Sequence, residues 1–366
     1  MESLQLELEK EKKSVLEMMS DMEHEQVVFC HDKHTGLKAI IAIHNTVLGP
    51  ALGGTRMWNY QNESEALNDV LRLSRGMSYK AAISGLNLGG GKAVIIGDSY
   101  TGKSEALFRR FGRFVDSLGG KYITAEDVGI SPQDMEYVHM ETNHVSGLPI
   151  SMGGSGDPSP VTAYGVYVGM KACSNYTWGN DSLAGKKVLV QGIGHVGEFL
   201  VGHLVKEGAK VIVTDINEAR MKAVVEKYNV DAVIGDEVYD LDMDIYAPCA
   251  LGATVNSNTI DRLKCKIIAG AANNQLENEE LHGMMVKDRG IVYAPDFLIN
   301  AGGLISVNSE VYKLSAERSM EMTEKIYDGV LNILNLSEEK NIPTSQAALE
   351  LAKSRIDIVS KVKSGR

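Results

Sequence analysis

Two lysines and a glycine run stand close together in the first third of the sequence. Lys80 and Lys92 bound the segment, and Gly89, Gly90 and Gly91 immediately precede Lys92. Glycine lets a backbone approach a ligand closely, and a lysine beside it can bind an anion or, once desolvated, release its proton. This stretch therefore predicts the floor of an active site with one lysine for each task, and leaves open which lysine has which.

The glycine run is not a phosphate-binding loop, because G-x-x-x-x-G-K-[ST] would need glycine at Leu86 and serine or threonine at Ala93. The spacing of Lys80 behind Leu73 and Met77 places it on the buried side of a predicted helix. A lysine whose stem follows an apolar surface while its ammonium stays in water is an equally weighted alternative.

A third candidate, Asp127, follows a predicted strand at 122–125. Loop acids are usually solvated, so the same pattern fits an ordinary surface carboxylate. No metal is expected, because the sequence has neither an H-E-x-x-H nor a C-x-x-C pair. We expect the scattered cysteines to be free thiols: Cys30, Cys173, Cys249 and Cys265.

Length and charge limit the kind of protein. A chain of 366 residues is long enough for two domains with well-buried cores. Its 37 basic and 48 acidic side chains give a net charge of -11 without any basic run, which argues against nucleic acid or an acidic membrane as partner. The apolar segments are strand-sized and the N-terminus is charged, which predicts a cytoplasmic protein without membrane spans.

Several elements must position these groups. Segments 2–19 and 62–80 predict helices, and apolar runs at 25–30 and 37–43 predict strands. The glycine-rich segment 48–56 predicts a tight bend or a binding loop. Lys92 is expected to begin a strand that ends near residue 97, with a helix following at 104–118. The glycines and prolines of 151–160 predict a domain boundary, with Pro160 near the start of the next helix.

A nucleotide-binding pattern begins at residue 187. An apolar strand enters Gly192-x-Gly194-x-x-Gly197, a helix follows to residue 207, and a second strand at 209–214 ends in Asp215. The glycines admit a pyrophosphate to the helix N-terminus, while Asp215 is placed to bind a ribose and to repel a 2′-phosphate. This βαβ unit predicts NAD rather than NADP. A domain that binds nucleotide only for structure or sensing is the alternative.

Three more buried strands are predicted in the second half of the chain, at 244–250, 266–270 and 290–296. Each ends in small or polar residues, as expected where a parallel sheet contacts a ligand. The segments 271–274 and 300–303 are therefore predicted ligand loops, and the segment 316–360 is predicted to be mostly helical.

Five motifs together resemble the glutamate/leucine/phenylalanine/valine dehydrogenase family over nearly the whole chain after residue 23. They are LGPALGGTRMW at 48–58, GLNLGGGK at 85–92, TAEDVG at 124–129, APCALG at 247–252 and ANNQL at 272–276. The second and third motifs look more like those of the members that oxidise branched-chain amino acids than those of the phenylalanine enzymes.

The resemblance implies oxidative deamination of an L-amino acid to its 2-oxo acid and ammonium, with NAD as hydride acceptor, and the reverse reductive amination. It implies that Lys80 binds the substrate carboxylate as an ammonium. It makes Lys92 the general base that activates water, and Asp127 the group that exchanges a proton with the substrate nitrogen. A second cation and apolar surroundings would both lower the pKa of Lys92 toward the working pH.

The resemblance also implies which residues bind the substrate and the cofactor. The substrate set comprises Gly53 and Gly54 beside the carboxylate and an apolar group around the side chain: Leu52, Met77, Ala125, Leu304 and Val307. The cofactor set comprises Gly192, Gly194, Gly197, Asp215, Thr162, Cys249, Ala250, Asn273 and Asn274. No basic residue lines the apolar group, which argues against glutamate as substrate. Leu304 and Ser306 depart from the residues expected in leucine enzymes, so the order of preference among leucine, valine and isoleucine stays open.

We therefore predict an α/β fold with two domains. An N-terminal α/β substrate and oligomerisation domain (1–150) precedes a Rossmann-type doubly wound NAD-binding domain (151–335), and C-terminal helices (336–366) return to the first domain. The active site is expected in the cleft between the domains, where closure excludes water. The resemblance implies a homo-oligomer, an octamer in the leucine enzymes. A phenylalanine or valine enzyme of the same family and a catalytically silent NAD-binding sensor are the alternatives.

Overall fold

The computed structural model describes residues 13–364, which form two compact units. Unit 1 comprises residues 13–81, 87–149 and 359–364, and unit 2 comprises residues 82–86 and 150–358. The predicted domain limits stay predictions; in the structure, residues 336–358 belong to unit 2 and only 359–364 to unit 1. Of the helix predicted at 2–19, residues 2–12 lie outside the described residues, and α2 (Val15–Asp21) is the part that follows.

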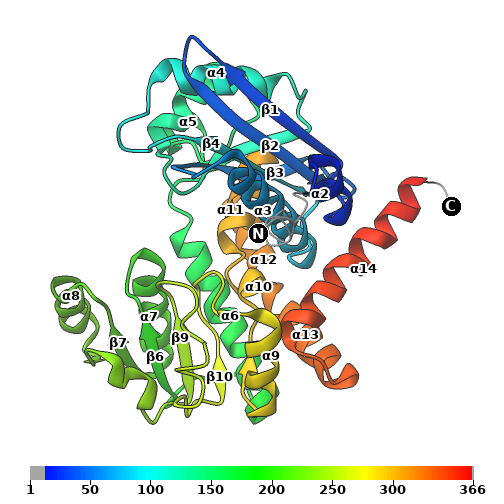
Figure 1. The fold of residues 1–366 in the computed structure, drawn as a ribbon. Coiled ribbons are helices and arrows are strands. Elements are labelled where there is room, and N and C mark those ends of the chain that lie inside the picture. Colours follow the sequence, from blue (N-terminus) through cyan, green and yellow to red (C-terminus); the bar gives the residue numbers. More distant parts are fainter. Residues whose placement is uncertain (1–12, 365–366) are drawn as a thin grey trace, which may run out of the picture. The chain divides into compact units, whose positions relative to one another are not determined.

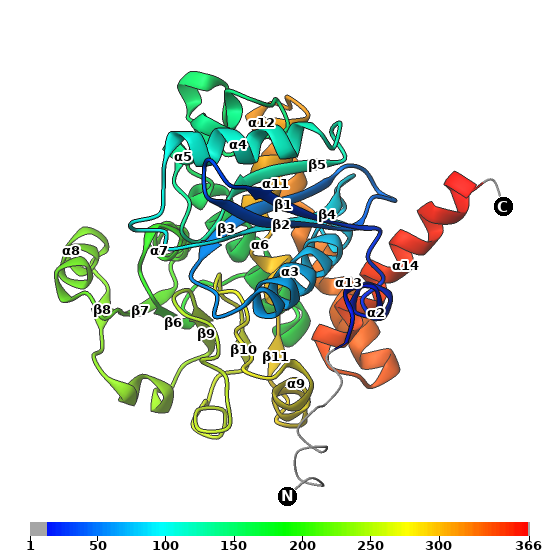
Figure 2. The ribbon, with the colours of Figure 1, turned by 45° about the horizontal axis from the view of Figure 1, so that its top comes forward.

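Unit 1 is a five-stranded sheet with helices on both faces. Its strands are β1 (Gln26–Asp32), β2 (Leu37–Asn45), β3 (Ala51–Trp58), β4 (Gly89–Ile96) and β5 (Tyr122–Glu126). Their order is β1-β2-β4-β3-β5, in which β2 runs antiparallel to β1 and β4 whereas β3 runs parallel to β4 and β5. Figure 2 shows α3 (Glu63–Ile83) on one face and α4 (Glu105–Asp116) on the other, and α5 (Pro132–His139) packs beside α4. The central strands β4 and β3 are thus covered on both sides.

Alternate residues of β2 pack on opposite faces of the sheet, against different helices. Ile41 and Ile43 share a buried cluster with Phe111 of α4, whereas Ile40 packs in a second cluster with Leu71 of α3. Because both faces are buried, the strand has a nearly continuous apolar sequence instead of an alternating one. The strand predicted at 37–43 is confirmed.

The glycine run lies inside β4, which corrects the prediction that this strand begins at Lys92. A Cβ at Gly90 would lie 2.1 Å from the Ser78 nitrogen of α3, and a Cβ at Gly91 would lie 2.7 Å from the Tyr122 ring. The run is glycine because neighbouring elements pack directly on this backbone, so it continues the strand instead of forming a turn. Lys92 consequently lies in the interior of a rigid strand.

We expect Gly90→Ala to lower the free energy of unfolding by about 3 kcal/mol, because the new methyl group meets backbone atoms of α3 that cannot rotate away. Gly76→Ala is the matched control on α3, since nothing lies within 4 Å of a Cβ there. Removing a helical glycine at that site should stabilise the protein by about 0.5–1 kcal/mol. Urea unfolding followed by circular dichroism measures both values, and a neutral Gly90→Ala would contradict the close packing.

Unit 2 is built on a six-stranded parallel sheet (Figure 1). Its strands are β6 (Lys187–Gln191), β7 (Lys210–Thr214), β8 (Asp231–Ala232), β9 (Ile245–Pro248), β10 (Ile267–Ile268) and β11 (Val292–Tyr293). Their order is β11-β10-β9-β6-β7-β8, and every pairing is parallel. The direction of strand succession reverses between β6 and β9, where doubly wound sheets bind nucleotides. The predicted two-domain α/β fold with a Rossmann-type sheet is confirmed.

The helices of unit 2 connect and flank these strands. They are α6 (Ser159–Trp178), α7 (His195–Glu207), α8 (Glu218–Tyr228), α9 (Glu279–Asp288), α10 (Asp296–Ile299), α11 (Gly302–Val311), α12 (Ala316–Glu324), α13 (Ile326–Lys340) and α14 (Thr344–Ser364), the last of which ends in unit 1. The mostly helical segment predicted at 316–360 is confirmed as α12 to α14. No helix within residues 13–364 combines the length and apolar character needed to cross a membrane.

Candidate active site

Lys92 and Asp127 form an ion pair in unit 1. Lys92 lies on β4, Asp127 directly follows β5, and β3 lies between these two strands. Lys92 Nζ is 2.5 Å from Asp127 Oδ2, with 9% of the lysine side chain and 23% of the aspartate side chain exposed. The structure therefore brings together two of the three predicted catalytic residues, and Asp127 is not the solvated loop acid of the alternative.

The surroundings shift both groups. Burial is the largest influence on Lys92 and holds the pKa of its ammonium below the ordinary lysine value, although Asp127 opposes that shift. Burial would raise the pKa of Asp127, but the charge and hydrogen bond of Lys92 outweigh it, so the pKa of Asp127 lies below its usual value. The pair thus combines a lysine that gives up its proton more readily with a carboxylate that stays ionised.

Gly53 and Gly54 allow the strands to approach closely enough for this pair. Both lie in β3, so the bend or loop predicted at 48–56 is wrong from Ala51 onward. A Cβ at Gly53 would lie 1.7 Å from the Gly91 carbonyl oxygen, and a Cβ at Gly54 would lie 3.0 Å from the Cβ of Asp127. Any side chain here would displace β4 or Asp127. Their predicted place beside the substrate carboxylate stays a prediction.

Lys80 lies in the last turn of α3 and is half-buried, as is Met77 one turn earlier. This burial is compatible with both alternatives for Lys80, the inward-facing lysine and the one whose ammonium reaches water. Leu52 of β3 and Ala125 of β5 are buried, and Ala125 pairs with Gly54 in the sheet. The predicted unit 1 residues therefore lie on α3 and on the adjacent strands β4, β3 and β5.

Arg56 and Asp69 extend the ion pair into a network of four charges. Arg56 Nε lies 3.4 Å from Asp127 Oδ2, and Arg56 Nη1 lies 2.9 Å from Asp69 Oδ2. Burial lowers the pKa of Arg56, but Asp127 and Asp69 outweigh it and raise that pKa, so the guanidinium stays charged. The sequence analysis did not single out either residue. The available signal was an arginine within a strand otherwise made of small and apolar residues.

The glycine loop of unit 2 lies at the carboxyl end of β6. Gly192 has a φ of 94°, and a Cβ there would lie 2.4 Å from the Cβ of Ala250. A Cβ at Gly197 would lie 2.0 Å from the Gly192 carbonyl oxygen, whereas nothing lies within 4 Å of one at Gly194. The first glycine makes the turn, the third lets α7 close against it, and the second leaves open space at the helix N-terminus. A dinucleotide pyrophosphate fits these requirements.

Asp215 follows β7 and lies beside this loop. Its Oδ2 accepts a hydrogen bond from the Ile193 N–H at 2.8 Å, and its Oδ1 accepts one from the Asn217 N–H at 2.8 Å. The carboxylate is therefore oriented by the loop itself, at the strand end where a ribose would bind in this fold.

The other predicted cofactor residues gather near the ends of β9 and β10. Cys249 accepts a hydrogen bond from the Ala271 N–H at 3.5 Å through its sulfur, and Ala250 contacts the Gly192 turn. Asn300 donates from Nδ2 to Asn273 Oδ1 at 2.8 Å, which joins the two predicted ligand loops. Asn274 has a φ of 51° at the bend of its loop.

Thr162 belongs to the first turns of α6, where its hydroxyl donates to the Pro158 carbonyl at 3.0 Å. The start of α11 packs against it, since a Cβ at Gly302 would lie 2.6 Å from Thr162 Cα. Leu304, which is buried, and Val307, which is half-buried, are on α11. Their predicted contact with the substrate side chain stays a prediction.

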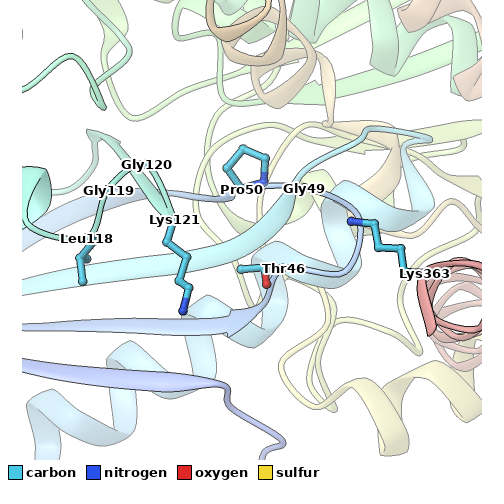
Figure 3. Close-up of a pocket in the computed structure, with 8 residues that line it drawn as sticks. All are labelled: Thr46, Gly49, Pro50, Leu118, Gly119, Gly120, Lys121 and Lys363. Carbon is cyan, nitrogen blue, oxygen red and sulfur yellow. The ribbon is translucent and has the colours of Figure 1, made fainter.

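A pocket of about 430 Å³ in unit 1 contains none of the predicted site residues (Figure 3). It is lined by Thr46, Gly49, Pro50, Leu118, Gly119, Gly120, Lys121 and Lys363. Lys121 donates to the Gln26 side chain at 3.2 Å. The pocket is therefore separate from the Lys92–Asp127 pair. Within residues 13–364, no group of three or more histidine, cysteine or acidic side chains is arranged to hold a metal ion.

Comparison with known proteins identifies relatives along the whole described chain. Residues 24–144 match the Glu/Leu/Phe/Val dehydrogenase dimerisation domain, and residues 153–219 and 212–362 match the Glutamate/Leucine/Phenylalanine/Valine dehydrogenase domain. The chain is 53% identical to a leucine dehydrogenase of Thermoactinomyces intermedius over 96% of this chain and 95% of the relative. It is 54% identical to a leucine dehydrogenase of Bacillus subtilis (strain 168) over 94% of this chain and 95% of that one.

A solved structure shares this fold. The crystal structure of L-tryptophan dehydrogenase from Nostoc punctiforme superimposes with a TM-score of 0.87 at 46% identity, covering 94% of this chain and 99% of that one. Similarity of this extent includes both the sheet that carries Lys92 and the parallel sheet with its glycine loop. The chain therefore belongs to the Glutamate/Leucine/Phenylalanine/Valine dehydrogenase family.

Proposed function

We propose that this protein catalyses the reversible NAD-dependent oxidative deamination of branched-chain L-amino acids, L-leucine foremost. The observation that carries the proposal is the 2.5 Å contact between Lys92 and Asp127, in a member of a family of amino-acid dehydrogenases. A base of lowered pKa beside an ionised carboxylate is what proton transfer at an amine and a water requires. The two leucine dehydrogenases described above favour leucine as substrate.

The side chains of unit 1 divide the proton transfers. Lys80 holds the substrate carboxylate as an ammonium, and Asp127 takes one proton from the substrate ammonium. Neutral Lys92 takes a proton from the water whose oxygen bonds to the iminium carbon. When the carbon–nitrogen bond breaks, Asp127 returns its proton to the leaving nitrogen, and of the two water protons one ends on ammonia and the other is released. The ionised Asp127 also stabilises the cationic iminium.

Unit 2 supplies the dinucleotide site, because the glycine turn, the open space at Gly194 and the oriented Asp215 carboxylate all fit NAD. When bound, NAD⁺ accepts the hydride, so that the amino acid, water and NAD⁺ give the 2-oxo acid, ammonium, NADH and a proton. An acid at residue 215 repels a 2′-phosphate, which favours NAD over NADP.

Asp215→Ala is expected to weaken NAD binding about 10- to 100-fold, because it removes charge-assisted hydrogen bonds to the ribose. Titration calorimetry of the full chain with NAD and with NADP measures this effect without turnover. Asp231→Ala, which removes an exposed acid on the neighbouring strand β8, is the matched control and should leave both affinities unchanged. Equal binding of NADP and NAD by the unaltered protein would contradict the assignment.

The substrate preference follows from an apolar lining that includes the buried Leu52 and Ala125. A panel of amino acids with NAD and NADP, read by absorbance of the reduced cofactor at mildly alkaline pH, tests it. Leucine, valine and isoleucine should be oxidised faster than glutamate, since no basic side chain in that lining pairs with a second carboxylate. Faster oxidation of phenylalanine or tryptophan would show that the substrate is an aromatic amino acid and not a branched-chain one. The similarity to L-tryptophan dehydrogenase makes an aromatic amino acid the second candidate. No turnover with any amino acid would favour the NAD-binding sensor.

We also propose a homo-oligomer in the cytoplasm. The match of residues 24–144 to a dimerisation domain supports self-association, and an octamer is the state that the family resemblance implies. Light scattering coupled to size exclusion measures the mass, and a monomer would contradict the proposal.

A further inference from the structure

Arg56 is held between two carboxylates next to the Lys92–Asp127 pair. It lies on β3, where 24% of its side chain is exposed, and its Nε is 3.4 Å from Asp127 Oδ2. The Lys92 ammonium contacts the same oxygen at 2.5 Å. Two cations thus lie within ion-pair distance of one oxygen of Asp127, so their charges favour this orientation of the carboxylate.

Asp69 keeps Arg56 in this place. It lies on α3 with 16% of its side chain exposed, and its Oδ2 accepts from Arg56 Nη1 at 2.9 Å. The Tyr60 hydroxyl donates to the same Oδ2 at 2.8 Å, and Arg72 Nη2 donates to Oδ1 at 3.0 Å. Because both oxygens of Asp69 are bound, Arg56 meets a fixed anchor and is oriented before any substrate arrives.

The charges of this network act on Lys92 in opposite directions. After burial, which lowers the pKa of Lys92, Asp127 raises it, Arg56 lowers it and Asp69 raises it. Arg56 also lies against Asp127 Oδ2, the oxygen that the Lys92 ammonium contacts, so its positive charge weakens the attraction of Asp127 for the Lys92 proton. Other titratable or charged groups that face the network are Tyr60, Arg72 and Tyr122.

We propose that Arg56 is a positioning residue, which orients Asp127 and sets how readily Lys92 releases its proton without touching the reacting atoms. The inference rests on the proposed function for the role of Lys92 as base. Arginine suits this place because its guanidinium stays charged and its planar fork reaches both carboxylates. A lysine would supply the charge without that bridging geometry.

Arg56→Gln tests the proposal through the pH profile of kcat/KM for L-leucine. Removing the cation raises the pKa of Lys92. The acid limb of the profile, where kcat/KM falls as the pH falls, should therefore move to higher pH by about one pH unit, with about a tenfold loss of kcat/KM at pH values below the limb. Arg56→Lys restores the charge without the bridging geometry. The limb should therefore return toward its original pH, while kcat stays below that of the unaltered protein and KM changes little. Asp69→Asn removes a charge that opposes Arg56, so its limb should move in the other direction, to lower pH.

A readout without turnover separates this proposal from the proposed function. Labelling of the unliganded full chain by acetic anhydride over a pH series, read by mass spectrometry at Lys92, reports the proton affinity of that amine. We expect the midpoint to rise in Arg56→Gln and to fall in Asp69→Asn. If the unaltered protein oxidises no amino acid, the proposed function fails, and the labelling midpoints still decide whether Arg56 acts on Lys92.

Arg109→Gln is the matched control, because Arg109 pairs with a mostly buried carboxylate of the same unit, Glu141 at 2.6 Å, outside this network. It should move neither the limb nor the labelling midpoint. Urea unfolding of each variant shows whether it is folded, and the opposite shift of Asp69→Asn keeps the test open if Arg56→Gln does not fold. An unmoved limb and midpoint in Arg56→Gln would overturn the proposal, however much activity is lost.

Discussion

Lys92→Ala is expected to lower kcat for L-leucine by about 10³-fold while the protein still binds NAD. The variant removes the base that takes the proton from water, and general-base contributions of about 10²–10⁴-fold are typical. KM should change less than kcat, because Lys80 and not Lys92 is proposed to hold the substrate carboxylate. Steady-state kinetics and NAD titration of the same preparation measure both effects.

Lys103→Ala is the matched control for this variant. Lys103 Nζ also lies 2.5 Å from a mostly buried carboxylate, Asp134 Oδ2, in the same unit. Its removal takes a cation away from a mostly buried carboxylate as Lys92→Ala does, so any loss of stability should be comparable while kcat stays within about twofold. Full turnover by Lys92→Ala would remove Lys92 from the mechanism.

Asp127→Asn is expected to lower kcat by about 10²-fold and to move the acid limb of kcat/KM to lower pH. The amide keeps the shape of the carboxylate but cannot exchange the proton of the substrate nitrogen. It also removes the charge that opposes the lowered pKa of Lys92, so that pKa should fall further. Because the base must be neutral, the active form then persists to lower pH than in the unaltered protein.

The pH profile of Asp127→Asn distinguishes its catalytic role from a structural one. Asp134→Asn, which neutralises the partner of Lys103, should leave the limb in place. A limb of Asp127→Asn that moves to higher pH, or not at all, would contradict the electrostatic coupling between Asp127 and Lys92. A kcat equal to that of the unaltered protein would exclude Asp127 from proton transfer.

Local patterns predicted most of the elements of both units. The apolar run at 37–43, the helix that carries Lys80 and the strand–glycine–helix unit at 187–207 each depend on neighbours within a few residues. The structure has β2, α3 and the β6–α7 unit at these places. Such signals are readable because backbone geometry and the burial of one face repeat with a short period along the chain.

Around β3 and β4, tertiary packing set the strand limits, and the local sequence pattern predicted those limits wrongly. Glycines at 53–54 predict a bend or a loop, because glycine is usual in turns, and the glycines at 89–91 precede a strand that is predicted to begin at Lys92. In the structure they lie inside strands, since neighbouring backbone and side-chain atoms leave no room for a Cβ. A clash with atoms from distant parts of the chain has no signature in the local sequence.

By itself, the sequence determined the parts of this protein that depend on nearby residues: the βαβ nucleotide unit, the helix that carries Lys80 and the rejection of a phosphate loop. Only the tertiary structure decided that Lys92 meets Asp127 and that Arg56 and Asp69 join them. Those contacts arise from the strand order β4-β3-β5, in which β3 lies between two strands that follow it in the chain. Strand order is set by burial on both faces of the whole sheet, so a short window of sequence does not contain it.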